Sequence, residues 1–379
     1  MKGSILQMLG RPIYVYGMIF IPLFLFIMLT SLMSNGLPTQ VPAAIVDRDG
    51  TSMSRSLSQT LAGMQMVDIT AASESYSEAR HLMQEGKIYG FFLIPENFER
   101  DLLAGRKPVI SFYTNMTYYV PGTLLFKTFK STATYAKAGI ISSMMQSVGL
   151  PDSEVASLIQ PVVVETRPIG NPQLNYAIYL CNSFIPAILQ LMILLMTCYT
   201  LGEEIKKGTS VRLLHLADGS IIKALFAKLL PQTCLWIIIA MFMESWLFCW
   251  NEFPMHGSWG WLTLSEIMFV LASQGLAIFF FGIIPNLRLS LSISSLIGIL
   301  TFSIAAFSFP VESMYPAIGI FSWIVPVRYN FLIYIDQALN GIHVYYSRIW
   351  FVAYIIFMLL PFSMLWNIKK NFKNPVYVP

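Results

Sequence analysis

The sequence is short of charge. Asp, Glu, Lys and Arg make up 12% of its 379 residues, about half of the roughly 25% found in soluble domains. So few charges cannot cover a globular surface, and 55% of the residues are hydrophobic. Lipid is therefore expected to be part of the solvent. The net charge of +4 gives no reason to expect a nucleic-acid partner.

Cysteine, histidine and nucleotide-binding motifs are also scarce. The four cysteines lie in apolar stretches and none falls between residues 34 and 172, so buried thiols are expected rather than disulfides. The four histidines lack metal-ligand spacing. No G-x-x-x-x-G-K-[ST] phosphate loop is present: Gly86-Lys87 is followed by Ile88, and Lys207-Gly208-Thr209 has the wrong order. We therefore expect no metal site, no cofactor and no ATP hydrolysis on this chain.

Long apolar runs are abundant, and six of them reach the 20 or so residues that cross a bilayer. They lie at about Ile13–Met33, Ala177–Leu201, Leu229–Trp250, Trp261–Ile284, Leu289–Phe309 and Ile349–Trp366. The first run has no small-x-small cleavage site after it, so we expect it to remain as an anchor. The predicted fold is an α-helical polytopic membrane protein with six transmembrane helices and an inserted α/β extracytoplasmic domain.

Basic residues in short loops set the expected orientation. The segments expected on the cytoplasmic side contain Lys2, Arg11, Lys206, Lys207, Arg212, Lys223, Lys228, Arg288, Lys369, Lys370 and Lys373. Both termini are thus predicted to be cytoplasmic, with residues 34–172 outside. The expected organisation is residues 1–33 as an interfacial helix and first span, 34–172 as the external domain and 173–379 as a five-helix domain. Ile5, Leu6 and Leu9 would form the lipid-contacting interfacial helix, and a disordered terminus is the alternative.

The external segment alternates strand-like and helix-like patterns, which favours an α/β sandwich with a mixed sheet. Strands are expected at Val41–Val46, Met66–Thr70, Ile88–Ile94, Val109–Thr114 and Val162–Thr166, and helices at Ser52–Ala62, Ser73–Gln84, Glu96–Ala104 and Gly122–Val148. Ser73 is the expected N-cap of its helix. Asp47 and Asp49 are interpreted as turn residues, and Tyr113–Tyr119 as a solvated loop or a docking surface. Residues 310–348 are expected to hold a re-entrant or surface-lying helix pair, mainly within Val325–Leu339.

Three local motifs stand out in the sequence, two in the part after the external segment and one within it. They comprise Glu203, Glu204, Lys207, Gly208, Thr209, Leu213 and Leu214; then Pro310, Glu312, Met314, Pro326, Arg328 and Tyr329; and, in the external segment, Ile45-Val46-Asp47 with Ile94 to Phe98. Together with the one-plus-five arrangement of spans, they resemble type-2 ABC transporter permeases, in particular bacterial export permeases with a large periplasmic domain. Tyr315 separates Met314 from Pro316, and Ser220 lacks a preceding proline, which are departures from the family pattern.

The resemblance implies a cytoplasmic-membrane protein that works with an ABC ATPase subunit carrying ATP and Mg²⁺. It also implies a second permease, which is either a copy of this chain or a close relative. A periplasmic adaptor and an outer-membrane duct are further implied partners. In segment 202–228, Glu203 and Glu204 are expected to begin a helix, and Gly208-Thr209 to break it and cap a second one. Val211, Leu213 and Leu214 of that second helix are expected to enter an ATPase groove. The alternative is an ordinary positive-inside loop.

Polar residues inside the apolar spans are the remaining candidates, because they are costly there. Gln190, Glu244, Glu266 and Gln274 would line a substrate path, or would bond to neighbouring helices. The 21 Met and 27 Phe suit an amphipathic cargo such as a drug, a lipid-like molecule or a peptide, and suit lipid-facing packing equally. The function predicted is ATP-driven export. The alternatives are a membrane-anchored receptor or assembly platform, and an external enzyme, for which no nucleophile–base pair stands out.

Overall fold

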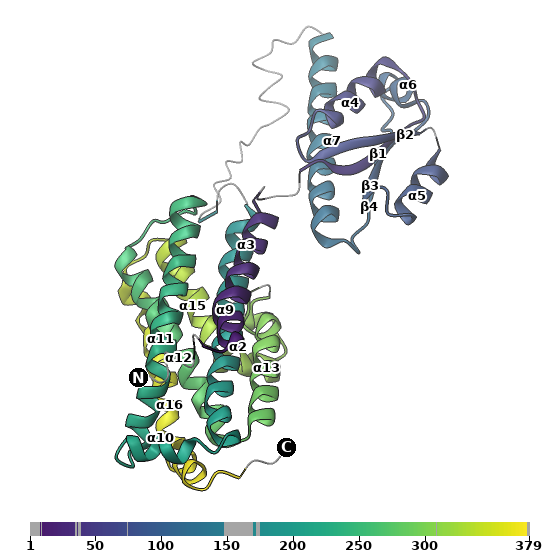
Figure 1. The fold of residues 1–379 in the computed structure, drawn as a ribbon. Coiled ribbons are helices and arrows are strands. Elements are labelled where there is room, and N and C mark those ends of the chain that lie inside the picture. Colours follow the sequence, from purple (N-terminus) through teal and green to yellow (C-terminus); the bar gives the residue numbers. More distant parts are fainter. Residues whose placement is uncertain are drawn as a thin grey trace. The chain divides into compact units, whose positions relative to one another are not determined.

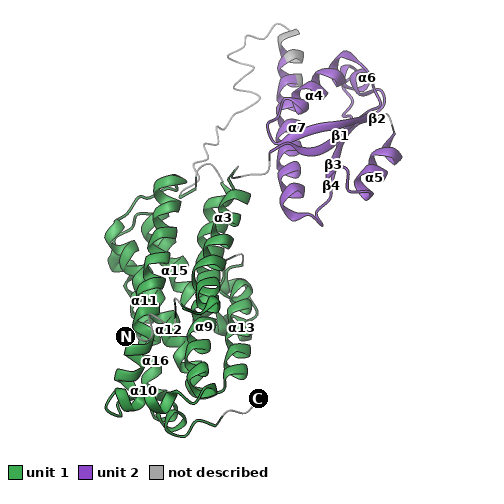
Figure 2. Cartoon of the chain, viewed as in Figure 1, with its two compact units in different colours: residues 1–36, 167–379 green, residues 37–166 purple. Residues whose placement is uncertain are grey.

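The computed structural model describes residue 8 and residues 10–34, 36, 39–73, 75–147, 170–171, 175–307 and 309–376. The chain divides into two compact units, residues 1–36 with 167–379 and residues 37–166 (Figure 2). The predicted interfacial helix around Ile5 to Leu9 and the predicted strand Val162–Thr166 lie outside the described residues.

The first unit is a bundle of long apolar helices (Figure 1). Six described helices are long and apolar enough to cross a membrane, which confirms the predicted fold class. They are Pro12–Leu32 (α2 Pro12–Val15, η1 Tyr16–Phe20 and α3 Ile21–Leu32), α9 Tyr176–Lys206, α11 Ile221–Ser245 with η2 Trp246–Trp250, α12 Trp259–Ile283, α13 Leu287–Ile304 and α16 Val344–Lys373. Helices α9, α11 and α16 extend beyond the predicted spans, because a helix continues through polar residues that an apolar window excludes.

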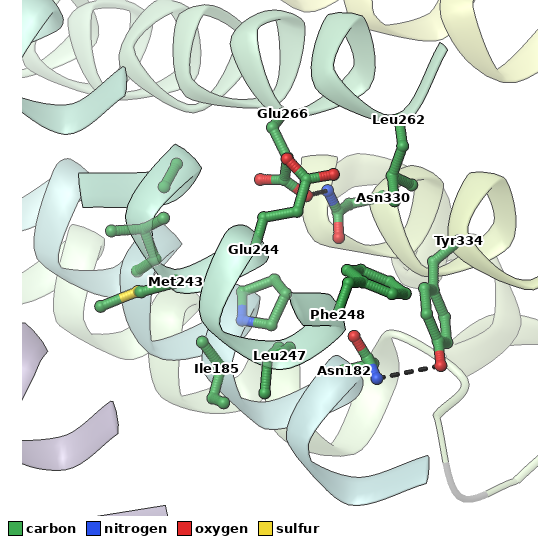
Figure 3. A pocket seen from close by; sticks show the side chains of 13 residues that line it. Asn182, Ile185, Met243, Glu244, Leu247, Phe248, Leu262, Glu266, Asn330 and Tyr334 are labelled. Atoms are coloured by element: carbon green, nitrogen blue, oxygen red, sulfur yellow. Dashed lines mark hydrogen bonds between the residues drawn. The ribbon is translucent and has the colours of Figure 1, made fainter. Parts of the chain in front are cut away.

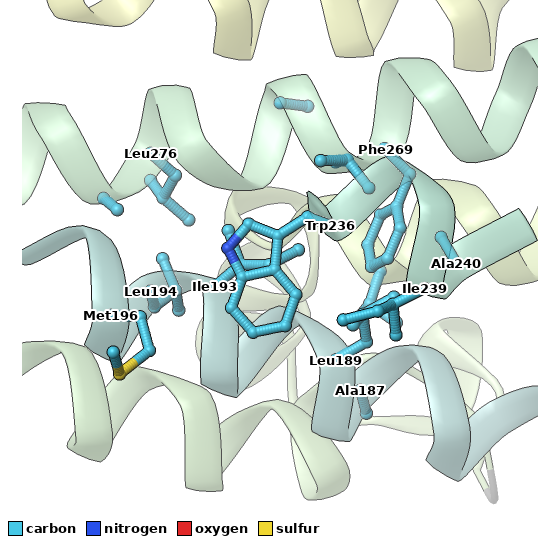
Figure 4. Packing of buried hydrophobic residues seen from close by; sticks show 14 of the residues in the cluster. Ala187, Leu189, Ile193, Leu194, Met196, Trp236, Ile239, Ala240, Phe269 and Leu276 are labelled. Atoms are coloured by element: carbon cyan, nitrogen blue, oxygen red, sulfur yellow. The ribbon is translucent and has the colours of Figure 1, made fainter. Parts of the chain in front are cut away.

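The core of this unit forms where α9, α11 and α12 meet. Trp236 of α11 is fully buried and points between Ile193 of α9 and Phe269 of α12 (Figure 4). Helix α12 also approaches α16 closely through two glycines seven residues apart. A Cβ added at Gly275 would lie 2.4 Å from the carbonyl oxygen of Phe357, so only glycine allows this approach.

Residues 310–348 contain a bent helix pair, preceded by the short η3 Val311–Ser313. The pair consists of α14 Pro316–Phe321 with η4 Ser322–Ile324, and of α15 Pro326–Tyr334 with η5 Ile335–Leu339, with a bend of 86° at Val325. Proline at the first position of α14 and of α15 suits a helix start. Nearly every residue of α15 is buried, so this helix packs inside the bundle and is not a surface-lying element.

The second unit is built on a four-stranded mixed sheet with the order β2-β1-β3-β4. The strands are β1 Val41–Asp47, β2 Val67–Ser73, β3 Gly90–Ile94 and β4 Ser111–Thr114, and the helices are α4 Ser52–Ala62, α5 Tyr76–Gln84, α6 Phe98–Leu103 and α7 Tyr119–Ser147. Strand β1 pairs in parallel with β2 and β3, and β4 is antiparallel to β3.

Side chains of this sheet alternate between two cores, as the period of a strand requires. Ile45 and Phe92 face a core shared with α4, α6 and α7, whereas Val46 and Phe91 face a smaller core shared with α5. The alternating helices and strands of the prediction are therefore present. Ser73 is not the N-cap of α5: strand β2 continues through Ser73, which pairs with Val46, and Ser75 takes the cap position.

Candidate functional site: the α10 end of the bundle and two polar cavities

A short helix, α10 (Ser210–Leu216), lies between α9 and α11 and defines one end of the bundle. Gly208 adopts φ +66° in the turn before it, a conformation that favours glycine and ends α9. The predicted break and second helix are therefore present. The prediction that Glu203 and Glu204 begin a helix is wrong, because both lie in the last turn of α9. Carboxylates are disfavoured there by the helix dipole and need nearby cations.

Glu203 has those cations. Its carboxylate forms ion pairs with Arg11 and with Lys207, the latter at 2.8 Å. The hydroxyl groups of Tyr14 and Tyr199 each donate to it at 3.3 Å. Because Arg11 and Tyr14 belong to the start of the first span, Glu203 ties that span to the end of α9.

Glu204 forms the second junction. Its carboxylate is paired with Lys228 of α11, and the Thr209 hydroxyl donates to it at 2.5 Å. The side chains of Glu204 and Lys228 are only 8% and 6% exposed. Thr209 stands at the N-cap position of α10 but makes no side-chain cap, so the predicted capping role is wrong. The backbone of Thr209 is helical, with φ −81° and ψ −11°, whereas an N-cap residue is typically extended.

The faces of α10 are divided between the bundle and the solvent. Leu214 is buried and Leu213 half-buried, so the prediction that both enter a partner groove is wrong for Leu214, which is needed for internal packing. Val211 and Leu216 point outward, at 46% and 75% exposure. An open depression of about 410 Å³ lies beside them, lined by Val211, Leu214, His215, Asp218, Gly219 and Lys373.

The two buried glutamines connect helices. The Gln190 carbonyl oxygen accepts from the Val327 backbone N–H at 2.8 Å, and its amide donates to Thr301 at 3.3 Å, which joins α9 to α15 and α13. The Gln274 carbonyl oxygen accepts from the Thr233 hydroxyl at 2.7 Å. This pair lines an otherwise apolar cavity of about 280 Å³ between α11, α12 and α16.

The two intramembrane glutamates meet at a second cavity (Figure 3). Glu244 comes from α11 and Glu266 from α12, and the cavity between α9, α11, α12 and α15 measures about 30 Å³. The Asn330 amide donates to Glu266 at 2.6 Å. Glu244 is only 7% exposed.

The residues of the bent helix pair are arranged around aromatic rings. The Arg328 guanidinium lies 4.5 Å from the centre of the Trp323 ring, and the Tyr329 hydroxyl donates to the Trp323 carbonyl oxygen at 2.8 Å. Pro326 begins α15. Pro310 and Glu312 are exposed and Met314 is half-buried, so this motif splits into an outer part and a buried part.

The model of the ABC-2 family of transporter proteins matches residues 13–368. The chain belongs to the ABC-2 family. No sequence among the curated proteins matches it. As an ABC-2 permease it is a multi-pass membrane subunit of an ABC transporter, and the family implies an ATPase partner subunit.

Several residues of this ABC-2 permease that matter at these sites did not stand out from the sequence. Arg11 and Tyr14 complete the Glu203 junction, Leu216 extends the exposed face of α10, and Asn330 contacts Glu266. Asn330 carries a usable signal, since an amide inside an apolar helix requires a hydrogen-bonding partner. The contact between Arg11 and Glu203 depends on how the first span and α9 are turned toward each other, and no pattern in the sequence indicates that.

Proposed function

We propose that this permease forms the membrane pathway of an ATP-driven exporter, which moves an amphipathic or hydrophobic substrate out of the cytoplasm or the inner membrane. The proposal is carried by one observation: ion pairs of the buried Glu203 and Glu204 join the end of α9, next to α10, to the first span and to α11, while α10 presents Val211 and Leu216 to the outside. An element that is held so firmly and exposed on one face is suited to receive force from a partner.

The force would pass through the two acidic junctions. A push on α10 reaches α9 and α11 through Thr209, Glu204 and Lys228, and reaches the first span through Glu203 and Arg11. These contacts are charged and sheltered, and interactions of that kind are weakened less by salt than those of exposed pairs. The ATPase would therefore act on three helices at once.

Orientation and assembly complete the proposal. The basic residues of the short loops favour α10 and both termini in the cytoplasm and residues 37–166 outside. The first, fifth and sixth spans have the smallest share of buried residues, at 28%, 28% and 22% of an 18-residue apolar window. A second permease copy and membrane lipids would cover the rest. If the host has two membranes, a periplasmic adaptor and an outer-membrane duct would continue the path, with the exposed Tyr118 and Tyr119 as one docking surface.

Co-purification of the permease with its ATPase tests the coupling role. We expect Val211→Asp combined with Leu216→Asp to remove the ATPase from the complex, because the two carboxylates oppose burial of an apolar face. Leu103→Asp is the matched control, since Leu103 is 67% exposed and belongs to the other unit, distant in the sequence from α10. Recovery of equal ATPase with both variants would refute the role of α10.

Thiol labelling of intact cells tests the orientation. Gly208→Cys and Gly105→Cys are well matched, because both glycines have φ near +70° and neither has a heavy atom within 4 Å of an added Cβ. The exposed Cys234 and Cys249 must first be replaced by Ser. A membrane-impermeant reagent should label position 105 and leave position 208 unmodified until the cells are opened. Equal labelling would contradict the proposed topology.

A further inference from the structure

The Glu244–Glu266 cavity holds two carboxyl groups with no basic partner. Its lining residues are Asn182, Ile185, Pro186, Leu189, Ala240, Met243, Glu244, Leu247, Phe248, Leu262, Glu266, Asn330 and Tyr334, and they include no Lys, Arg or His. Figure 3 shows the Glu244 and Glu266 side chains among those that line the cavity. Two acidic groups so placed in an apolar bundle favour a positive charge supplied from elsewhere.

One of these groups is left without a hydrogen bond. The Oε1 atom of Glu244 is buried and has no hydrogen-bond partner among the described residues. Glu244 as a whole is 7% exposed. Glu266, by contrast, accepts from Asn330. An unpartnered buried oxygen is costly, and such atoms in native proteins commonly mark a missing ion, water or ligand. Glu244 is among the residues that line the cavity, so we place the missing donor there.

Size and lining restrict what that donor is. A space of about 30 Å³ accommodates roughly two waters, which is enough for one small cationic group and too little for a whole organic molecule. Among the described residues no group of three or more His, Cys, Asp and Glu could hold a metal ion. The walls are mostly apolar, and the Phe248 ring can attract a cation through its face. The cavity is partly open, so a longer apolar chain can extend from it.

We propose that Glu244 and Glu266 bind the primary ammonium group of an amphipathic cation. Three N–H donors on one nitrogen match the free Glu244 oxygen and the remaining acceptors on Glu266, while the apolar part of the ligand extends out of the cavity through its open side. This inference rests on the proposed export function and specifies its substrate class: a single-chain amine carrying one positive charge.

Direct binding to the purified, full-length permease tests the site without the ATPase. The protein is reconstituted in nanodiscs of zwitterionic phosphatidylcholine, and binding of radiolabelled decylammonium is measured by equilibrium dialysis, with empty nanodiscs subtracted. We expect saturable binding of one decylammonium per chain. Unlabelled 1-decanol, which lacks the charge, should not compete, and decyltrimethylammonium, whose head is too large and has no N–H, should compete at least tenfold more weakly.

Three variants locate the binding. Glu244→Gln and Glu266→Gln keep the shape of the side chain and remove its charge, so each should weaken decylammonium binding at least tenfold. Glu252→Gln is the matched control, since Glu252 is an exposed acid in the loop after η2, and its binding should equal that of the parent protein. Monodisperse elution and unchanged circular dichroism establish folding. If one variant does not fold, the other still decides the question.

Several results would overturn the site. One is equally strong competition by decanol, and another is decylammonium binding that survives both Gln variants. A third is complete displacement of decylammonium when 100 mM NaCl or KCl replaces choline chloride in the buffer, which would assign the cavity to an inorganic cation. The outcome is separate from that of the export proposal. Charge-dependent binding with no associated ATPase would leave the site standing and refute export, whereas ATP-driven transport indifferent to Glu244→Gln would do the reverse.

Discussion

Replacing Lys228 with Met should destabilise the helical unit far more than replacing Lys228 and Glu204 together. The Lys228→Met variant leaves the Glu204 carboxylate in a site where its side chain is 8% exposed, with the Thr209 hydroxyl as a remaining donor. Breaking a buried pair in this way costs about 3–5 kcal/mol, since one charge loses its counter-charge without regaining water. The Glu204→Gln, Lys228→Met double variant has no such charge and should cost about 1 kcal/mol or less, the scale of one neutral hydrogen bond.

The free energy of unfolding in mixed micelles of increasing SDS content measures the difference, with helix content as the readout. A drop of 3–5 kcal/mol corresponds to a thermal midpoint lower by roughly 6–20 °C, at about 2–4 °C per kcal/mol for a unit of this size. The double variant should recover most of that loss, giving a coupling energy above about 2 kcal/mol. A mild single variant, or additive losses, would refute the reasoning by showing that water already reaches Glu204 and Lys228.

Three further substitutions test packing and capping. Gly282→Ala should cost about 1–3 kcal/mol of bundle stability in the same SDS titration, since its Cβ would lie 2.3 Å from that of Met364. Gln190→Leu should lose about 1–3 kcal/mol because the buried Val327 N–H is left unpaired, and Gln190→Glu, which retains an acceptor, serves as the comparison. Asp49→Ala should lower the stability of the 37–166 unit, followed by limited proteolysis, by about 1–2 kcal/mol, because Asp49 accepts from the first two N–H groups of α6; Asp49→Asn should retain most of it.

The position of each helix along the chain could be predicted because it depends on local properties. A run of about 20 apolar residues must cross the bilayer or be buried, whatever surrounds it. Gly208 likewise ends α9 through its own backbone preference, and the turn at Asp47 to Gly50 follows from side-chain bonds within a few residues. These elements needed no knowledge of distant contacts.

The side of each helix that is directed toward the interior of the bundle could not be predicted in the same way. Helices that are apolar all round carry no stripe that identifies their inner side. Sequence reasoning therefore placed Glu203 and Glu204 at a helix start and Leu214 in a partner groove, although the acids end α9 and Leu214 packs internally. Lys207 is a local partner of Glu203, but Arg11 and Lys228, the other two cations at the end of α9, come near only when the chain folds.

The sequence alone determined that this chain spans a membrane six times, carries an inserted α/β unit and has the motif order of a type-2 ABC permease. Only the tertiary structure decided that Glu244 and Glu266 face one cavity and that Glu204 meets Lys228. The physical reason is that hydrophobic length and turn preference act within a few residues, whereas the pairing of charges is decided by how rigid helices rotate and pack against one another.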